Sequence, residues 1–121
     1  MQDWPTPHER ITQTVTSWPG VEAGPGRRGE FAFTVRGREI GHLHGNHAAH
    51  FGFPKELGAQ LKAEGRVVDH PVFPGRSGAA SRRIADEEDV REVLALLRLN
   101  YERAMASGDA RERDRAAPAR S

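Results

Sequence analysis

Three stretches of the chain repeat apolar residues at the spacing of an α-helix, and each has a typical helix start. The first covers residues 7–17 and follows Thr6, which can form a capping box with Glu9. The second covers about residues 54–64 and ends before Gly65, a residue type suited to a helix C-terminus. The third has Asp86 as its N-cap and an acidic first turn, and it carries the apolar stripe Val90, Val93, Leu94, Leu97 and Tyr101.

Shorter stretches rich in strand-forming residues lie between these helices and are bounded by glycine or proline turns. In the stretch 30–35, for example, the residues Phe31, Phe33 and Val35 share one face. Pro71 confines the strand that would contain it to a sheet edge or a break. The predicted strands are residues 21–23, 30–35, 39–44, 47–53, 66–73 and 79–84.

The elements follow in the order α-β-β-β-(β)-α-β-β-α. This order predicts an α+β fold, with a single antiparallel sheet of about five to six strands and three helices. The chain has 121 residues, which is enough for one domain. We predict a single domain over residues 1–106. Residues 107–121 are charged and rich in alanine and lack an apolar face, so we expect a disordered tail there.

Charge and composition argue against several classes of protein. The formal net charge is only +1, which argues against a nucleic-acid partner held through phosphate contacts. The absence of cysteine excludes disulfides and thiolate metal sites. No apolar run approaches the roughly 20 residues of a membrane span, and no signal pattern opens the chain. We therefore expect a cytoplasmic protein without a membrane partner, whose oligomeric state the sequence leaves open.

Candidate chemistry centres on histidine, because four of the six histidines lie close together as His42, His44, His47 and His50. If residues 45–46 form a two-residue turn, the first three of these share one face of a hairpin, and His50 lies on the other face. A longer loop would bring His50 in instead, since a slip of one residue exchanges the faces.

Three neutral imidazoles on one face can bind Zn²⁺ or a similar divalent ion. The metal set expected from the two-residue turn is His42, His44 and His47. We favour another interpretation, in which these are half-exposed hairpin residues bonded to the backbone or to water. We accordingly expect no cofactor.

Residues 36–101 resemble the luciferase-domain family, small bacterial and fungal proteins that are similar to fungal luciferases. The resemblance rests on residues 38–45, the helix start Phe53-Pro54, the segment from Leu61 to His70, and residues 86–101 of the third helix. The order of the elements is also similar to the MmcQ/YjbR-like fold, which has been discussed as a DNA-binding architecture.

The last predicted strand departs from the family pattern. Relatives typically carry Ser-Gly-Trp-Val-Ser-Phe-Arg-Ile, where this chain reads Ser77-Gly78-Ala79-Ala80-Ser81-Arg82-Arg83-Ile84. An aromatic residue is thus missing at position 79, and an apolar one at position 82. If the tryptophan lines a ligand pocket in relatives, the pocket of this protein is wider or absent.

The resemblance implies a pocket between the sheet and the second helix that binds an aromatic small molecule. The expected catalytic residues are His42 and His44 together with His70, any of which can serve as a general base. For His70 taken alone, we favour the interpretation of a strand-end histidine satisfied by hydrogen bonds. The expected ligand-binding residues are Phe31, Phe33 and Arg83.

A second hypothesis is a non-catalytic module that binds protein or nucleic acid through the hairpins. The MmcQ/YjbR-like order of elements suggests it, and the missing tryptophan at position 79 fits a loss of catalysis. The near-neutral charge argues against the nucleic-acid version.

Overall fold

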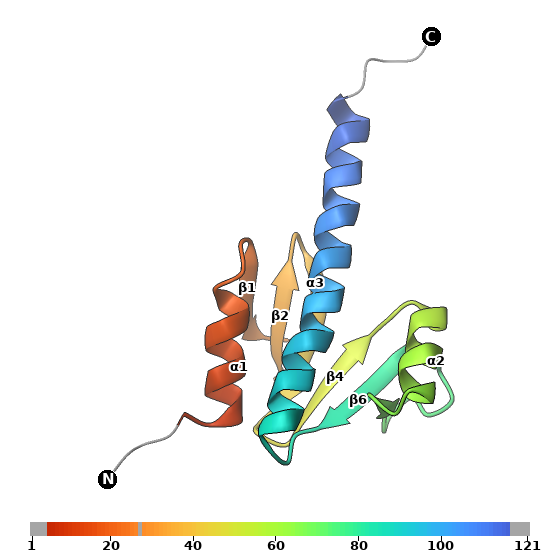
Figure 1. Cartoon of the computed structure of the whole chain (residues 1–121). Helices are drawn as coiled ribbons and strands as arrows, with labels where there is room; N and C mark the ends of the chain where they lie inside the picture. Colours follow the sequence, from red (N-terminus) through yellow and green to blue (C-terminus); the bar gives the residue numbers. More distant parts are fainter. Residues whose placement is uncertain (1–4, 27, 117–121) are drawn as a thin grey trace.

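The computed structural model describes residues 5–26 and 28–116, with side chains described up to residue 107 (Figure 1). Three helices and one antiparallel six-stranded sheet confirm the predicted α+β fold. The sheet order is β1-β2-β3-β4-β6-β5, so the strand near Pro71 lies at an edge. The elements are α1 (Pro7–Thr16), β1 (Val21–Pro25), β2 (Phe31–Val35), β3 (Arg38–His44), β4 (Ala48–Gly52), α2 (Lys55–Ala63), β5 (Val68–Asp69), β6 (Ala79–Arg83) and α3 (Glu87–Ala116).

One face of the sheet packs against α1 and α3, which lie side by side across it (Figure 1). The capping box predicted for α1 is present, because Thr6 Oγ1 accepts a hydrogen bond from the Glu9 amide and the Glu9 carboxylate accepts one from Thr6. Near the other end of the sheet, α2 packs beside β6. The largest fully buried side chains of this core are Phe33, Ile11, Ile40, Leu43, Leu61, Leu96 and Leu97. Among the described helices, none combines the length and apolar composition needed to cross a bilayer.

A β-bulge in β3 changes which side chains share a face. The register between β2 and β3 shifts next to Phe33, so that Gly41 pairs with Phe33 while Glu39 pairs with the following residue. Ile40 is the extra residue, and its carbonyl accepts a hydrogen bond of 3.1 Å from the Asn100 side chain of α3. In a regular strand, residues three apart point to opposite faces. The bulge therefore brings Glu39 onto the same face as His42, three positions later.

The hairpin between β3 and β4 has a three-residue loop, so the predicted two-residue turn is wrong. The ladder pairs His42 with His50 and His44 with Ala48. His50 therefore lies on the face of His42 and His44, whereas His47 is in the loop. This is the alternative register that a longer loop produces.

Contacts from distant parts of the chain hold this loop. The backbone amide of His8, at the start of α1, donates a hydrogen bond of 2.9 Å to the Asn46 side chain. The carbonyl of His47 accepts a hydrogen bond of 2.7 Å from the amide of Ile84, just after β6. Gly45 takes a positive φ of 56°, which glycine adopts without strain. Both hydrogen bonds join residues far apart in the chain, so local turn preferences could not reveal the register.

Helix α3 continues to Ala116, where we expected a disordered tail from residue 107. Five of the residues 107–116 are alanine or arginine, which have high helix propensity. Extension from a helix that is already packed as far as Ala104 avoids the cost of nucleation. Residues 117–121 of the expected tail lie outside the described residues, and the domain limit at residue 106 stays a prediction.

Candidate functional site

The sheet face opposite α1 and α3 carries an open hollow of about 1150 Å³. Its rim comes from the loop between β1 and β2 and from residues 70–73. We expected the pocket between the sheet and α2, but no residue of α2 lines this hollow. The reason is that α2 packs on the core side, where Leu61 is fully buried. All six histidines of the chain line the hollow: His8, His42, His44, His47, His50 and His70.

Three of these histidines form a tight cluster at the junction of β3 and β4. One ring nitrogen from each of His42, His44 and His50 lies within 4.8 Å of the others. The ring centres of His44 and His50 are 4.1 Å apart, and His42 lies 5.0 and 5.2 Å from these two rings. The expected metal set with His47 is therefore wrong, because the three-residue loop puts His50 opposite His42 instead.

Glu39, which no pattern in the sequence marks as a site residue, fixes the orientation of the His42 ring. Its carboxylate lies 3.0 Å from His42 Nδ1. An ionised carboxylate can only accept a hydrogen bond, so Nδ1 carries a proton, and in the neutral ring Nε2 presents its lone pair. The two residues share a face because of the bulge, which no periodic pattern in the sequence announces.

His50 is the most buried histidine of the cluster, with 7% of its surface exposed. Burial, followed by the nearby His44, His70 and His42, lowers the pKa of His50 to about 4. Its ring is therefore neutral at physiological pH. Within the described residues, its buried Nδ1 has no hydrogen-bond partner.

His70 extends the cluster, with its ring centre 4.3 Å from that of His50 and 5.2 Å from that of Phe73. The amide of Val72 donates a hydrogen bond of 3.1 Å to His70 Nδ1, so the proton of the neutral ring is on Nε2. Burial, followed by His42, His44 and Arg28, lowers the pKa of His70. The three histidines expected to be catalytic thus line one hollow, with His50 between them.

Of the two phenylalanines expected to bind ligand, only Phe31 lines the hollow. It is half-buried, and its ring centre lies 4.7 Å from that of His8. Phe33 shares its face, as predicted, but that face is the core side and Phe33 is fully buried there. A different aromatic residue, Phe73, lines the hollow instead. It lies in a loop, where hydrophobic periodicity gives no signal.

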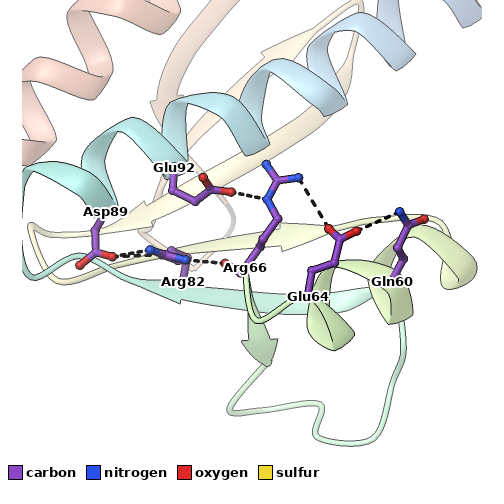
Figure 2. Close-up of polar contacts among 6 residues, drawn as sticks. All are labelled: Gln60, Glu64, Arg66, Arg82, Asp89 and Glu92. Carbon is purple, nitrogen blue, oxygen red and sulfur yellow. Dashed lines mark hydrogen bonds and ion pairs between the residues drawn. The ribbon is translucent and has the colours of Figure 1, made fainter.

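The two arginines of β6 point to opposite faces. Arg83 is exposed and pairs in the ladder with Ala48, but it lies outside the histidine hollow. Arg82 turns toward α3, where its guanidinium donates a hydrogen bond of 2.6 Å to Asp89 and one of 2.9 Å to the carbonyl of Arg66. Figure 2 shows these contacts continuing through Arg66 to Glu92. Where relatives carry an apolar residue, this chain thus ties β6 and the end of α2 to α3 through ion pairs.

Position 79, where relatives carry tryptophan, lies on the histidine side of β6. Ala79 pairs with Gly52, next to the pair formed by His50 and Ser81. Two small residues, Ala79 and Gly52, therefore lie near the histidine cluster at the position where relatives carry the tryptophan.

The comparison with protein families gives one match. A model described as Luciferase domain matches residues 37–100, which are 64 of the 121 residues. The match begins at the turn before β3 and includes Glu39, His42, His44, His50 and His70. No curated protein and no solved structure matches the chain.

Proposed function

Since the chain belongs to the luciferase-domain family, we propose that it binds a small aromatic molecule with an ionisable oxygen in the histidine-lined hollow. The observation that carries this proposal is the gathering of His42, His44, His50 and His70 in one open hollow. Phe73 also lines it, with its ring centre 5.2 Å from that of His70, and offers an aromatic face to a planar ligand.

The tautomers of two histidines give the hollow a proton acceptor and a proton donor. Glu39 holds the proton of His42 on Nδ1, which leaves Nε2 to accept a proton from the ligand. The Val72 amide occupies His70 Nδ1, so His70 Nε2 donates. A phenol or enol oxygen can give its proton to His42 Nε2 and accept a hydrogen bond from His70 Nε2. His42 is thus the proposed general base, Glu39 positions it, and His70 orients the ligand.

A ligand screen in the presence of a chelator tests this proposal. We expect phenolic pyrones to raise the melting temperature and to shift the ring ¹⁵N resonances of His42 and His70. Phe73→Ala should weaken binding because it removes an aromatic wall. Val68→Ala is the matched control, because Val68 is exposed but does not line the hollow. If no member of the panel shifts either signal, or if His42→Gln binds as well as the wild type, the proposal fails.

The second candidate function is a non-catalytic interaction module. Val68 and Val72 are 63% and 59% exposed, and Val68 lies on the edge strand β5. An exposed apolar sheet edge can receive a strand from a partner. If a Val68→Lys variant fails to bind a protein partner that the wild type binds, the result favours the interaction module over the small-molecule site. If the protein gives no gel shift with duplex DNA at low salt, where phosphate contacts dominate binding, the nucleic-acid version of this candidate is excluded.

A further inference from the structure

The cluster of His42, His44 and His50 has nearly the geometry of a three-histidine metal site. Ligand nitrogens about 3.4 Å apart suit a tetrahedral ion with metal–nitrogen bonds of about 2.0–2.1 Å. In this cluster the three nitrogens lie within 4.8 Å of one another. His42 and His50 are fixed opposite each other in the ladder, whereas His44 is exposed. Binding of an ion therefore requires side-chain rotations that bring these nitrogens closer together, and the widest separation of ring centres, 5.2 Å, is between His42 and His50.

A carboxylate already supports one of the three rings. Metal-bound histidines almost always donate their second ring N–H to a carboxylate, a backbone carbonyl or water, which fixes the tautomer and raises the basicity of the ligating nitrogen. Glu39 plays this part for His42, at 3.0 Å from Nδ1. The bulge at Ile40, held by Asn100, is what places the carboxylate there.

The ring of His50 is not committed to another partner. It is more than nine-tenths buried, and its Nδ1 makes no hydrogen bond within the described residues. A buried polar atom without a partner is costly, and such atoms in native proteins usually have one. His70 differs, since its Nδ1 is already occupied by the amide of Val72. The rings of His42, His44 and His50 are thus the ones available to an ion.

We infer that His42, His44 and His50 bind a divalent transition metal ion of the zinc class, with Glu39 as the carboxylate that orients His42. Three imidazoles without thiolates suit Zn²⁺, Co²⁺, Ni²⁺ or Cu²⁺, whereas Mg²⁺ and Ca²⁺ prefer oxygen ligands. Three protein ligands leave a fourth position for water or for a ligand oxygen. An ion bound there would occupy the lone pair of His42 Nε2. The ligand oxygen would then bind to the ion and not to His42.

Metal titration of the full chain without an affinity tag tests the site. Co²⁺ is the spectroscopic probe, because a tetrahedral site gives intense visible absorption, and calorimetry with Zn²⁺ gives the affinity. We expect one ion per chain. The titration contains no aromatic ligand and the ligand screen contains a chelator, so the two proposals can fail separately.

Matched variants of the same hairpin make the test specific. His44→Ala should abolish the tetrahedral Co²⁺ spectrum, and Glu39→Ala should weaken Zn²⁺ binding by about 10–100-fold while keeping the spectrum. His47→Ala is the control, because His47 is exposed and lines the same hollow but lies outside the set. Both His44 and Glu39 are exposed, so their variants should fold. The inference is overturned if the wild type shows no tetrahedral spectrum, or if His44→Ala and His47→Ala bind Zn²⁺ equally.

Discussion

Lowering the pH from neutral to about pH 5 is expected to destabilise the metal-free protein through His50. The pKa of this residue is about 4 in the folded chain, because the ring is buried and lies among His44, His70 and His42. In the unfolded chain it returns to its ordinary value of about 6.5. The unfolded state therefore takes up a proton at a higher pH than the folded state does. The contribution of neutral His50 to the free energy of unfolding is fully present above about pH 6.5, and it is lost as the pH falls toward 4.

The size of the effect follows from these two values. Linkage between protonation and unfolding gives a loss of about 2 kcal/mol between about pH 7.5 and pH 5, rising to about 3 kcal/mol below pH 4. The lowered pKa of His70 adds in the same direction. Carboxylates whose pKa is lowered in the fold, such as Asp89 and Glu87, contribute only at lower pH, because they stay ionised in both states above about pH 5. Measurements near pH 5 therefore isolate the histidines.

Urea denaturation followed by circular dichroism, with a chelator present throughout, measures this dependence. His50→Gln cannot titrate in this range, so it should lose most of the difference in unfolding free energy between the two pH values. His47→Gln is the control and should keep it, because His47 is exposed in the loop. An equal drop in stability for the wild type and His50→Gln would refute the assignment of the effect to His50.

Three substitutions test the scaffold that positions the site. Asn100→Leu should cost about 2 kcal/mol, because its amide donates a buried hydrogen bond to the bulge carbonyl of Ile40 and a half-buried one to the carbonyl of Gly52; an unchanged urea midpoint would contradict this. Gly58→Ala should lower the melting temperature, because a Cβ there would lie 2.0 Å from the carbonyl oxygen of Ser77; a wild-type melting curve would mean that α2 can move away at no cost. Arg82→Met should cost about 1–3 kcal/mol, because it removes the ion-pair partner of the half-buried Asp89 on α3; equal stability of the variant and the wild type in denaturant would show that the ion pair contributes nothing.

Local sequence signals predicted the helices well. The capping box of Thr6 and Glu9 forms as expected, and Asp86 accepts a hydrogen bond of 2.9 Å from the Asp89 amide at the start of α3. Such caps involve residues three apart, so their geometry depends little on the rest of the chain. The alternation of residues within each strand is also a local signal, and it predicted the sheet and the order of the elements. The end of α3 differs from the prediction, because the helix continues to Ala116 although the segment beyond Ala104 lacks an apolar face.

The candidate site was predictable only in part. The sequence placed His42 and His44 on one face, since alternation along a strand requires it. It could not choose between His47 and His50, because that choice depends on a loop length set by contacts with α1 and with the end of β6. Glu39 could not be found either, because a bulge breaks the alternation on which sequence reasoning relies.

By itself, then, the sequence determined the elements of this protein, their order and its concentration of histidine. Periodicity, caps and turn residues act over a few positions, and the chain states them directly. Tertiary structure alone decided that His50 rather than His47 joins His42 and His44, and that Glu39 supports the group. The physical reason is that strand register and the bulge are fixed by hydrogen bonds between residues far apart in the chain, among them the bond from Asn100 to Ile40.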